Sequence, residues 1–271
     1  YAAPLSVETT ALFYNMDMVT EVPDTWEELV EEASNDGGVQ FDATSIYYDL
    51  GFVRACGGYI FNYEDGAYDT TDIGLSNDGA IQAYQFIDDL CNKYNLITAD
   101  VTADIARSNF QNGKCAYYIG GPWDIDGFES AGVSFGITEM PTFNGENFVT
   151  PVGTQVSFVS NSSEKQDAAW QFIKYLIDNG AVDMYEAGDR IPAKLSDQNI
   201  DAIQNNEYTQ AFIAQINNGE PMPTVSEMGQ LWTIHTNNIR SMWSGEQTPE
   251  EAAKNMVAQL EEAIKLMDSG K

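Results

Sequence analysis

The sequence predicts an α/β fold, with helices packed on the faces of a sheet. Short strand-like runs alternate along the chain with longer segments of helical periodicity. Hydrophobic residues make up 43% and aromatic residues 12% of the 271 positions, which is enough for a sizeable core. We find no internal repeat and no linker rich in proline or serine, so two lobes would have to be joined through ordered strands.

The expected strands are short runs rich in β-branched and aromatic residues. They cover residues 5–7, 12–14, 114–119, 134–137 and 156–159. Residues 59–69 read YIFNYEDGAYD, and the Asp65-Gly66 pair at the centre predicts a β-hairpin.

The expected helices are marked by capping residues at their ends. Thr25 and Glu28 have the spacing of a capping box, and Thr248 followed by Pro249 begins the last helix. The remaining helices are expected over residues 80–94, 102–112 and 164–179.

The net charge of −30, from 42 acidic and 12 basic residues, argues against partners that carry phosphate. Such a field repels nucleic acid and anionic lipid headgroups. A solvated acidic surface that keeps the protein soluble explains the charge best.

The sequence offers little for metal binding or catalysis. Cys56, Cys91 and Cys115 are too far apart for a metal knuckle, and we expect no disulfide framework, with Cys91 and Cys115 buried and inert. His235 is the only histidine, and no phosphate-binding glycine loop is present. We therefore expect no catalytic residues, no metal site and no cofactor. No run approaches 18 apolar residues, and the chain does not open with a signal peptide.

Aromatic residues at the ends of elements are the clearest candidates for ligand contacts. Trp123 follows Ile-Gly-Gly-Pro, a sequence that predicts a tight turn between a strand and a helix at the rim of a sheet. Tyr47, Tyr48 and Trp232 also lie near ends of elements. Sugar rings stack on aromatic rings, whereas their hydroxyl groups need polar partners. Composition alone favours core packing at each of these positions, and we expect Trp170 and Trp243 in the core.

Five segments, in order along nearly the whole chain, are similar to the maltose and maltodextrin-binding proteins, which are solute receptors of ABC importers. They are VETTALFYNMDMV (7–19), PDTWEEL (23–29), GGYIFNYEDGAYD (57–69), FQNGKCAYYIGGPW (110–123) and GEPMPTVSEMGQLW (219–232).

The resemblance implies a two-lobe periplasmic-binding-protein-like (type II) fold, of which this chain is mainly the carboxy-terminal lobe. Residues 1–155 would form the first part of that lobe, with a hinge strand at 1–8. Residues 156–204 would belong to the amino-terminal lobe, and 205–271 would return to the carboxy-terminal lobe. Most of the amino-terminal lobe would lie outside this sequence, so we expect weak binding by this chain.

The resemblance also assigns ligand contacts. Glu8 matches an acceptor for sugar hydroxyls, with a hinge-stabilising charge as the alternative, and Tyr47 matches a stacking tyrosine, with Tyr48 as the alternative. Trp123 and Trp232 match stacking tryptophans, and Met222 matches an apolar wall. Ser45, Ile46 and Thr236 depart from the usual glutamate, proline and arginine, which implies fewer polar clamps.

The expected function is to bind malto-oligosaccharides outside the cytoplasmic membrane, free in the periplasm or lipid-anchored, and to deliver them to a membrane ABC permease. We expect a monomer that binds an α-glucan and no nucleic acid. The alternatives are a receptor of the same fold for another oligosaccharide, a carbohydrate-active enzyme and a structural surface protein.

Overall fold

A computed structural model describes residues 1–269, apart from the side chains of residues 35, 36 and 268. Its strands form two four-stranded sheets and a hairpin within this range. The first sheet has the order β10-β8-β1-β9, and the second has the order β3-β6-β2-β7. The strands of the first sheet are β1 (Ala2–Glu8), β8 (Pro151–Phe158), β9 (Ile191–Pro192) and β10 (Glu220–Pro221). Those of the second are β2 (Ala11–Asn15), β3 (Val39–Gln40), β6 (Tyr117–Gly120) and β7 (Phe135–Thr138).

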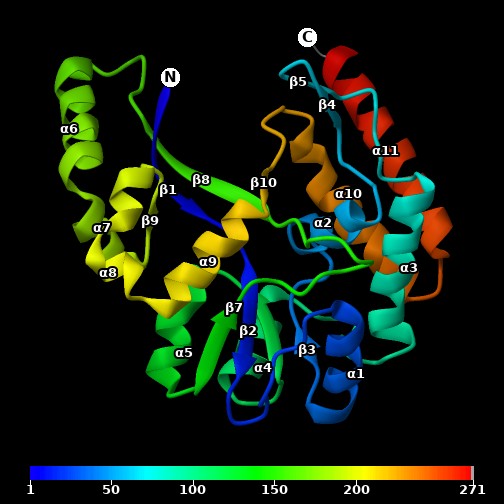
Figure 1. Cartoon of the computed structure of the whole chain (residues 1–271). Coiled ribbons are helices and arrows are strands. Elements are labelled where there is room, and N and C mark those ends of the chain that lie inside the picture. Colours follow the sequence, from blue (N-terminus) through cyan, green and yellow to red (C-terminus); the bar gives the residue numbers. More distant parts are fainter. Residues whose placement is uncertain (270–271) are drawn as a thin grey trace.

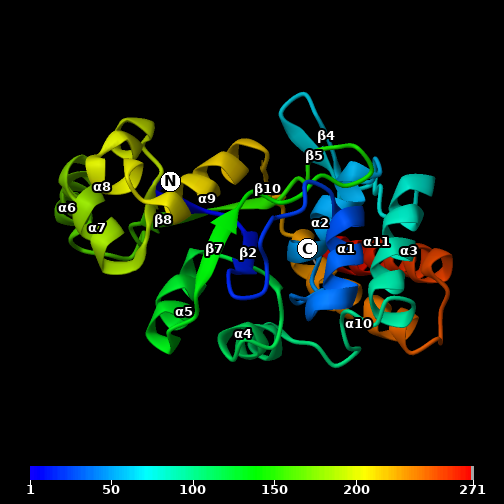
Figure 2. The same cartoon turned by 60° about the horizontal axis from the view of Figure 1, so that its bottom comes forward.

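The first sheet joins two bodies of unequal size (Figures 1 and 2). β1 and β8 run antiparallel over most of their length, with Ala2 opposite Phe158 and Glu8 opposite Gly153. The smaller body holds α6 (Gln166–Asn179), α7 (Ala181–Gly188), the 3₁₀ turn η2 (Leu195–Asn199) and α8 (Asp201–Gln204). The chain thus crosses between the bodies through ordered strands, as expected for a sequence that has no linker rich in proline or serine.

The larger body is built on the second sheet and carries the remaining helices. They are α1 (Trp26–Asp36), α2 (Ile46–Ala55), α3 (Asp78–Asn92), α4 (Ala103–Gln111), the 3₁₀ turn η1 (Pro122–Asp124), α5 (Ile125–Ala131), α9 (Glu207–Asn217), α10 (Met228–Trp243) and α11 (Pro249–Ser269). The hairpin of β4 (Asn62–Glu64) and β5 (Ala67–Asp69) projects from this body beyond α2 (Figure 2).

Local signals predicted many of these elements. The Thr25 side chain accepts a hydrogen bond of 3.1 Å from the backbone N–H of Glu28 at the start of α1. Thr248 and Glu251 form reciprocal cap bonds before α11. Asp65 and Gly66 have φ of 51° and 83°, as a tight hairpin turn requires. The predicted caps Thr25 and Thr248 and the predicted hairpin are therefore confirmed, while both bonds of a capping box are found at Thr248 and Glu251.

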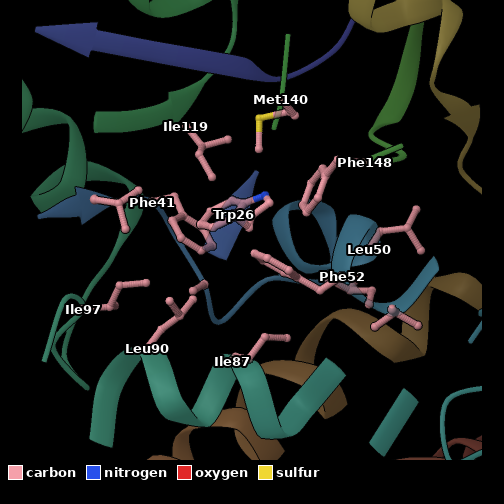
Figure 3. Close-up of a cluster of buried hydrophobic side chains, with 14 of the residues drawn as sticks. Trp26, Phe41, Leu50, Phe52, Ile87, Leu90, Ile97, Ile119, Met140 and Phe148 are labelled. Atoms are coloured by element: carbon pink, nitrogen blue, oxygen red, sulfur yellow. The ribbon is translucent and has the colours of Figure 1, made fainter. Parts of the chain in front are cut away.

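Large aromatic side chains fill the core of the bigger body (Figure 3). Trp26 contacts Phe52 at a ring-centroid distance of 4.7 Å and Phe148 at 5.8 Å. Gly51 of α2 permits this packing, because a Cβ there would lie 2.1 Å from the Phe148 ring. The close packing fixes α2, and with it the residues at its amino end.

Expectations about burial were met in part. Trp243 is buried and donates to the carbonyl oxygen of Ile87, as expected for a core residue. The expectation for Trp170 was wrong, because this side chain is exposed on α6, a helix on which Ile173 is buried. All three cysteines are free thiols; Cys115 is buried and Cys91 half-buried. Among the helices of residues 1–269, none has the length and apolar character needed to span a bilayer.

Candidate functional site

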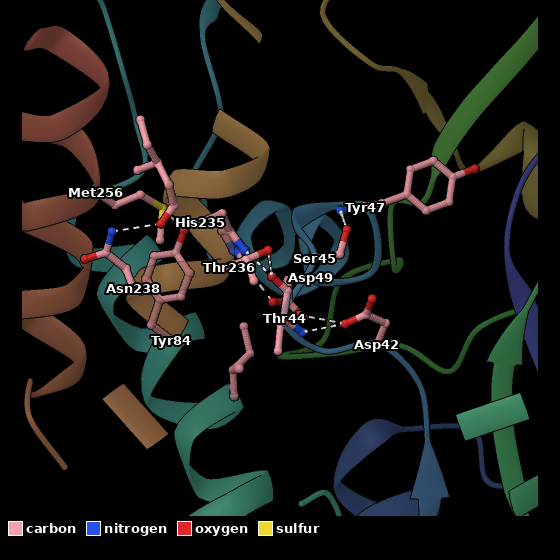
Figure 4. Close-up of polar contacts among 12 residues, drawn as sticks. Asp42, Thr44, Ser45, Tyr47, Asp49, Tyr84, His235, Thr236, Asn238 and Met256 are labelled. Carbon is pink, nitrogen blue, oxygen red and sulfur yellow. Dashed lines mark hydrogen bonds and ion pairs between the residues drawn. The ribbon is translucent and has the colours of Figure 1, made fainter. Parts of the chain in front are cut away.

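The amino end of α2 presents two tyrosines. Ser45 caps the helix by accepting a hydrogen bond of 3.3 Å from the backbone N–H of Tyr47. The rings of Tyr47 and Tyr48 meet edge to face, with centroids 5.6 Å apart. The Tyr47 side chain points away from the buried His235 and Asp49 (Figure 4). The first turn of α2 therefore offers adjacent aromatic rings with hydroxyl groups.

Both tyrosine hydroxyls stay protonated in their surroundings. Burial raises the pKa of Tyr47, and the negative charge of Glu8 adds to this effect. Burial also raises the pKa of Tyr48, to which Asp124 and Asp42 contribute. The charges of Glu8 and Asp124, residues far apart in the sequence, therefore both act on the first turn of α2.

Glu8 ends β1 and is held by neighbouring strands. Its Oε2 accepts from Nη1 of Arg190 at 2.9 Å, and its Oε1 accepts from Nε2 of Gln155 at 3.1 Å. The carboxylate links β1 to β8 and to the residue before β9, which fits the hinge-stabilising alternative. A carboxylate has about four acceptor positions, so capacity remains for a sugar hydroxyl.

Trp123 lies in η1, the turn between β6 and α5, as the sequence predicted. A Cβ on Gly121 would come within 2.3 Å of the Trp123 ring, and one on Gly120 within 2.4 Å of the Asp124 carboxylate. Glycine is therefore needed at both positions, because the side chains of Trp123 and Asp124 occupy the space that a Cβ would fill. The Trp123 side chain remains 40% exposed, so its ring is available to a ligand.

Asp124 anchors this turn, and sequence reasoning did not identify it. Its carboxylate is 1% exposed and pairs with Nε of Arg107. It also accepts hydrogen bonds from the Tyr118 hydroxyl at 2.9 Å and from the Gly121 N–H at 3.3 Å. The only signal in the sequence was the aspartate directly after the tryptophan. Its partner Arg107 lies 17 residues away and could not be matched to it.

Trp232 lies on α10, the helix that packs at the start of α2. The carbonyl oxygen of Thr44, just before α2, accepts from the Thr236 hydroxyl at 3.0 Å and lies 3.0 Å from Nδ1 of His235 (Figure 4). Trp232 lies one helical turn before Thr236 and is 38% exposed. The contact between α10 and Thr44 thus fixes a second exposed indole on the helix that packs at the start of α2.

Met222 lies apart from the two tyrosines of α2. It lines a cavity of about 630 Å³ together with Arg54, Glu220 and residues of the β4–β5 hairpin. The charges of Glu8 and Asp124 act on Tyr47 and Tyr48, whereas Met222 lines a cavity that none of these residues lines.

This arrangement favours the binding of a neutral, hydroxyl-rich ligand. Exposed indoles and tyrosine rings offer flat apolar faces, and the carboxylate of Glu8 accepts hydrogen bonds. Across the described residues, no group of three His, Cys, Asp or Glu side chains is placed to hold a metal ion. Stacking and hydrogen bonding are the chemistry that the site supplies.

Comparison with known proteins gives a consistent result. The sequence profile of a family described as bacterial extracellular solute-binding proteins matches residues 1–211. A galactooligosaccharide-binding protein of Bacillus subtilis (strain 168) is 32% identical, over 100% of this chain and 68% of its own length. A maltooligosaccharide ABC transporter solute-binding lipoprotein of Streptococcus pneumoniae (strain ATCC BAA-255 / R6) is 28% identical, over 98% of this chain and 66% of its own length.

Solved structures resemble this fold along almost the whole chain. The maltose-maltodextrin binding protein of Alicyclobacillus acidocaldarius superposes with a TM-score of 0.90 at 32% identity, covering 96% of this chain and 71% of that one. A cyclo/maltodextrin-binding protein complexed with maltotetraose gives 0.91 at 29% identity, covering 98% and 71%. This chain thus has the α/β fold of maltodextrin-binding proteins and spans about two thirds of the length of its relatives.

Proposed function

Because the chain belongs to the bacterial extracellular solute-binding proteins, we propose that it captures an oligosaccharide outside the cytoplasmic membrane for an ABC transporter. The observation that carries the proposal is the pair of exposed indoles, Trp123 on the turn η1 and Trp232 on α10, the helix that packs at the start of α2. Tyr47 and Tyr48 extend this aromatic surface, and Glu8 accepts hydroxyl groups beside it. Each stacked ring contributes about 1 to 3 kcal/mol, by analogy with base stacking.

Malto-oligosaccharides are the proposed ligand, since the proteins of both solved structures described above are named as maltodextrin-binding proteins. A galacto-oligosaccharide is the second candidate, because the Bacillus subtilis relative that binds that class is 32% identical to this chain. In both ligands the sugar ring presents an apolar CH face for stacking. The hydrogen bonds to its hydroxyl groups would decide between them.

The ligand would be held by closure of two lobes. We propose that the chain is divided between these lobes as the resemblance implied. Residues 1–155 and 205–271 would form one lobe, and residues 156–204 would belong to the other. The smaller body supports this division, because α6 exposes Phe172 and Tyr175, each 61% exposed, on a face that a lobe could cover. Contacts from both lobes would shift the population towards the closed state.

Delivery requires a membrane partner. We propose that the protein acts as a monomer and passes its sugar to an ABC permease, either free in the periplasm or held by a lipid anchor, as the name of the streptococcal relative suggests. Binding without turnover is proposed, and a reducing-end assay with maltoheptaose would reveal hydrolysis if the protein were a carbohydrate-active enzyme.

The test is a tryptophan-fluorescence titration with maltotriose, β-1,4-galactotriose and xylotriose. We expect saturable quenching with maltotriose alone. Trp123→Ala should lower the affinity for maltotriose at least tenfold. Trp170→Ala, which removes an exposed indole from α6, should leave that affinity unchanged. Saturation with galactotriose alone would select the second ligand, and equal loss in both variants would contradict the assigned surface.

A further inference from the structure

Buried polar groups face each other unpaired where α2 meets α10. Asp49 of α2 and His235 of α10 are both fully buried, and Oδ2 of Asp49 lies 3.6 Å from Nε2 of His235 (Figure 4). That distance is too long for a hydrogen bond. Among the described residues, neither carboxyl oxygen of Asp49 nor Nε2 of His235 has a hydrogen-bond partner. Unpaired buried groups cost free energy, so their presence here needs an explanation.

The protons on the two side chains favour a hydrogen bond between them. Nδ1 of His235 lies 3.0 Å from the carbonyl oxygen of Thr44, so Nδ1 carries the proton and Nε2 is an acceptor. Burial raises the pKa of Asp49 well above its usual range, and the charge of Asp42 raises it further, so the carboxyl group keeps its proton. A donor therefore faces an acceptor, and a movement of less than about 1 Å would join them.

One edge of the His235 imidazole is tied down, whereas the other is not. The carbonyl oxygen of Thr44 faces Nδ1 and also accepts from the Thr236 hydroxyl at 3.0 Å. The Asp42 carboxylate in turn holds Thr44, accepting from its backbone N–H at 3.3 Å and from its hydroxyl at 2.7 Å. A small rotation of α10 about Thr44 would therefore bring Nε2 to Asp49 without breaking these bonds.

Both helices carry aromatic residues of the proposed sugar-binding surface close to this contact. Tyr47 and Tyr48 are the two residues before Asp49 in α2, and Trp232 lies three residues before His235 in α10. Positions three apart are neighbours on a helix, so a movement of Trp232 is passed to His235. A sugar that stacks on Trp232 and on a tyrosine of α2 would draw the two helices together.

We propose that Asp49 is a positioning residue for ligand binding, whose carboxyl proton bonds to Nε2 of His235 when a sugar draws α2 and α10 together. The inference rests on the proposed function and adds residues that act on the site without touching the ligand. The buried hydrogen bond forms only in the complex, so it strengthens binding. Removal of the donor should weaken binding, whereas a different donor at the same position should preserve it.

Two substitutions of Asp49 separate the donor from the rest of the side chain. Asp49→Asn supplies an amide N–H₂ as donor, whereas Asp49→Leu has a similar size and no donor. In calorimetric titrations with maltotriose at pH 7, Asp49→Asn should bind within about twofold of wild type, and Asp49→Leu about fivefold more weakly. Asp49→Leu should resist urea at least as well as wild type, because it removes an unpaired buried polar group. Wild-type affinity in Asp49→Leu, or equal losses of affinity and stability, would overturn the positioning role.

The single histidine allows the bond to be observed directly in the wild-type chain. His235 is the only histidine in the sequence, so the nitrogen NMR spectrum contains one pair of imidazole signals. Maltotriose should move the Nε2 signal upfield, as happens when a bare imidazole nitrogen accepts a hydrogen bond, and should not move it in Asp49→Leu. If maltotriose binds and the wild-type signal does not move, the positioning role is wrong while the proposed function stands. If none of the three trisaccharides of the fluorescence test binds, the proposed function fails and this inference fails with it.

Discussion

Nε2 of His235 lies 3.6 Å from Oδ2 of Asp49, and both side chains are fully buried where α10 crosses α2. Nδ1 of His235 faces the carbonyl oxygen of Thr44, so the proton is on Nδ1 and the Nε2 that faces Asp49 is bare. Burial raises the pKa of Asp49 well above its usual range, aided by the charge of Asp42, and lowers that of His235 to about 4. The pair is therefore neutral in the fold, with the proton on the carboxyl group.

The first prediction concerns the pH dependence of stability. Unfolding lets His235 bind a proton below about pH 6.5, so on its own the histidine lowers stability as pH falls from 6.5 to about 4. Asp49 does the opposite, because the unfolded carboxyl loses above about pH 3.9 a proton that the fold retains. The two effects cancel while Asp49 stays protonated.

Asp49→Asn removes one of these effects and exposes the other. Relative to wild type, the free energy of unfolding of this variant should rise by about 1.4 kcal/mol per pH unit between pH 4 and 6.5. Urea unfolding at pH 4.5, 5.5 and 6.5 measures this difference, in which groups common to both proteins cancel. Parallel curves for the two proteins would show that the pair is not neutral in the fold.

The second prediction concerns the turn that presents Trp123. Gly121 has φ of −123°, which alanine can adopt, but the added Cβ would lie 2.3 Å from the indole. Gly121→Ala should therefore displace the ring, shift the fluorescence and weaken oligosaccharide binding about tenfold. Gly127→Ala in α5, where a Cβ meets no atom within 4 Å, is the control and should bind normally. Normal binding by Gly121→Ala would mean that the observed ring position is not needed.

Local signals in the sequence predicted much of the fold, and the exceptions have physical causes. The helix caps at Thr25 and Thr248 and the Asp65-Gly66 turn depend on neighbouring residues, so they can be recognised directly in the sequence. α2 was not predicted, because it is buried on most sides and shows no single apolar stripe. A helix was predicted over residues 164–179, where α6 lies, but the exposed Trp170 shows that local signals give the helix and not what covers it.

The candidate site could be predicted only where one residue carries the signal. Trp123 follows two glycines and a proline, and that pattern suffices to place an aromatic ring on a turn. The Arg107–Asp124 and Arg54–Glu220 pairs join residues distant in sequence, so their partners emerge only once the chain is folded. Glu8 was predicted as a ligand contact, whereas its bonds to Arg190 and Gln155 also tie strands together.

The third prediction addresses the apolar face of α6. Phe172→Ser removes a side chain that is 61% exposed, so the free energy of unfolding should change by less than about 0.5 kcal/mol. Ile173→Ser, one residue further on, removes a buried side chain and should cost about 3 kcal/mol. Urea unfolding compares the two variants. Equal destabilisation would mean that this face is already packed in the chain.

The last prediction separates the two carboxylates that share Arg107. Asp124 is buried and pairs with Nε of the guanidinium, whereas Asp104 contacts its Nη1 at 3.2 Å with a side chain that is 91% exposed. Asp124→Asn leaves a partly buried guanidinium without its close counter-charge and turns an amide N–H₂ towards groups that donate. The Arg107 side chain is 38% exposed, so the cost should be about 2 kcal/mol rather than the full penalty of a buried pair.

Asp104→Asn also removes a carboxylate that pairs with Arg107, but at an exposed position. The stability of this variant should therefore stay within error of wild type. Because Asp124 also accepts from the Gly121 N–H, its loss should loosen the turn and weaken oligosaccharide binding, whereas Asp104→Asn should bind normally. Urea unfolding and the fluorescence titration measure both quantities in both variants. Equal effects of the two substitutions would assign the role to the charge of Arg107 instead of to the buried bonds that hold Trp123 in place.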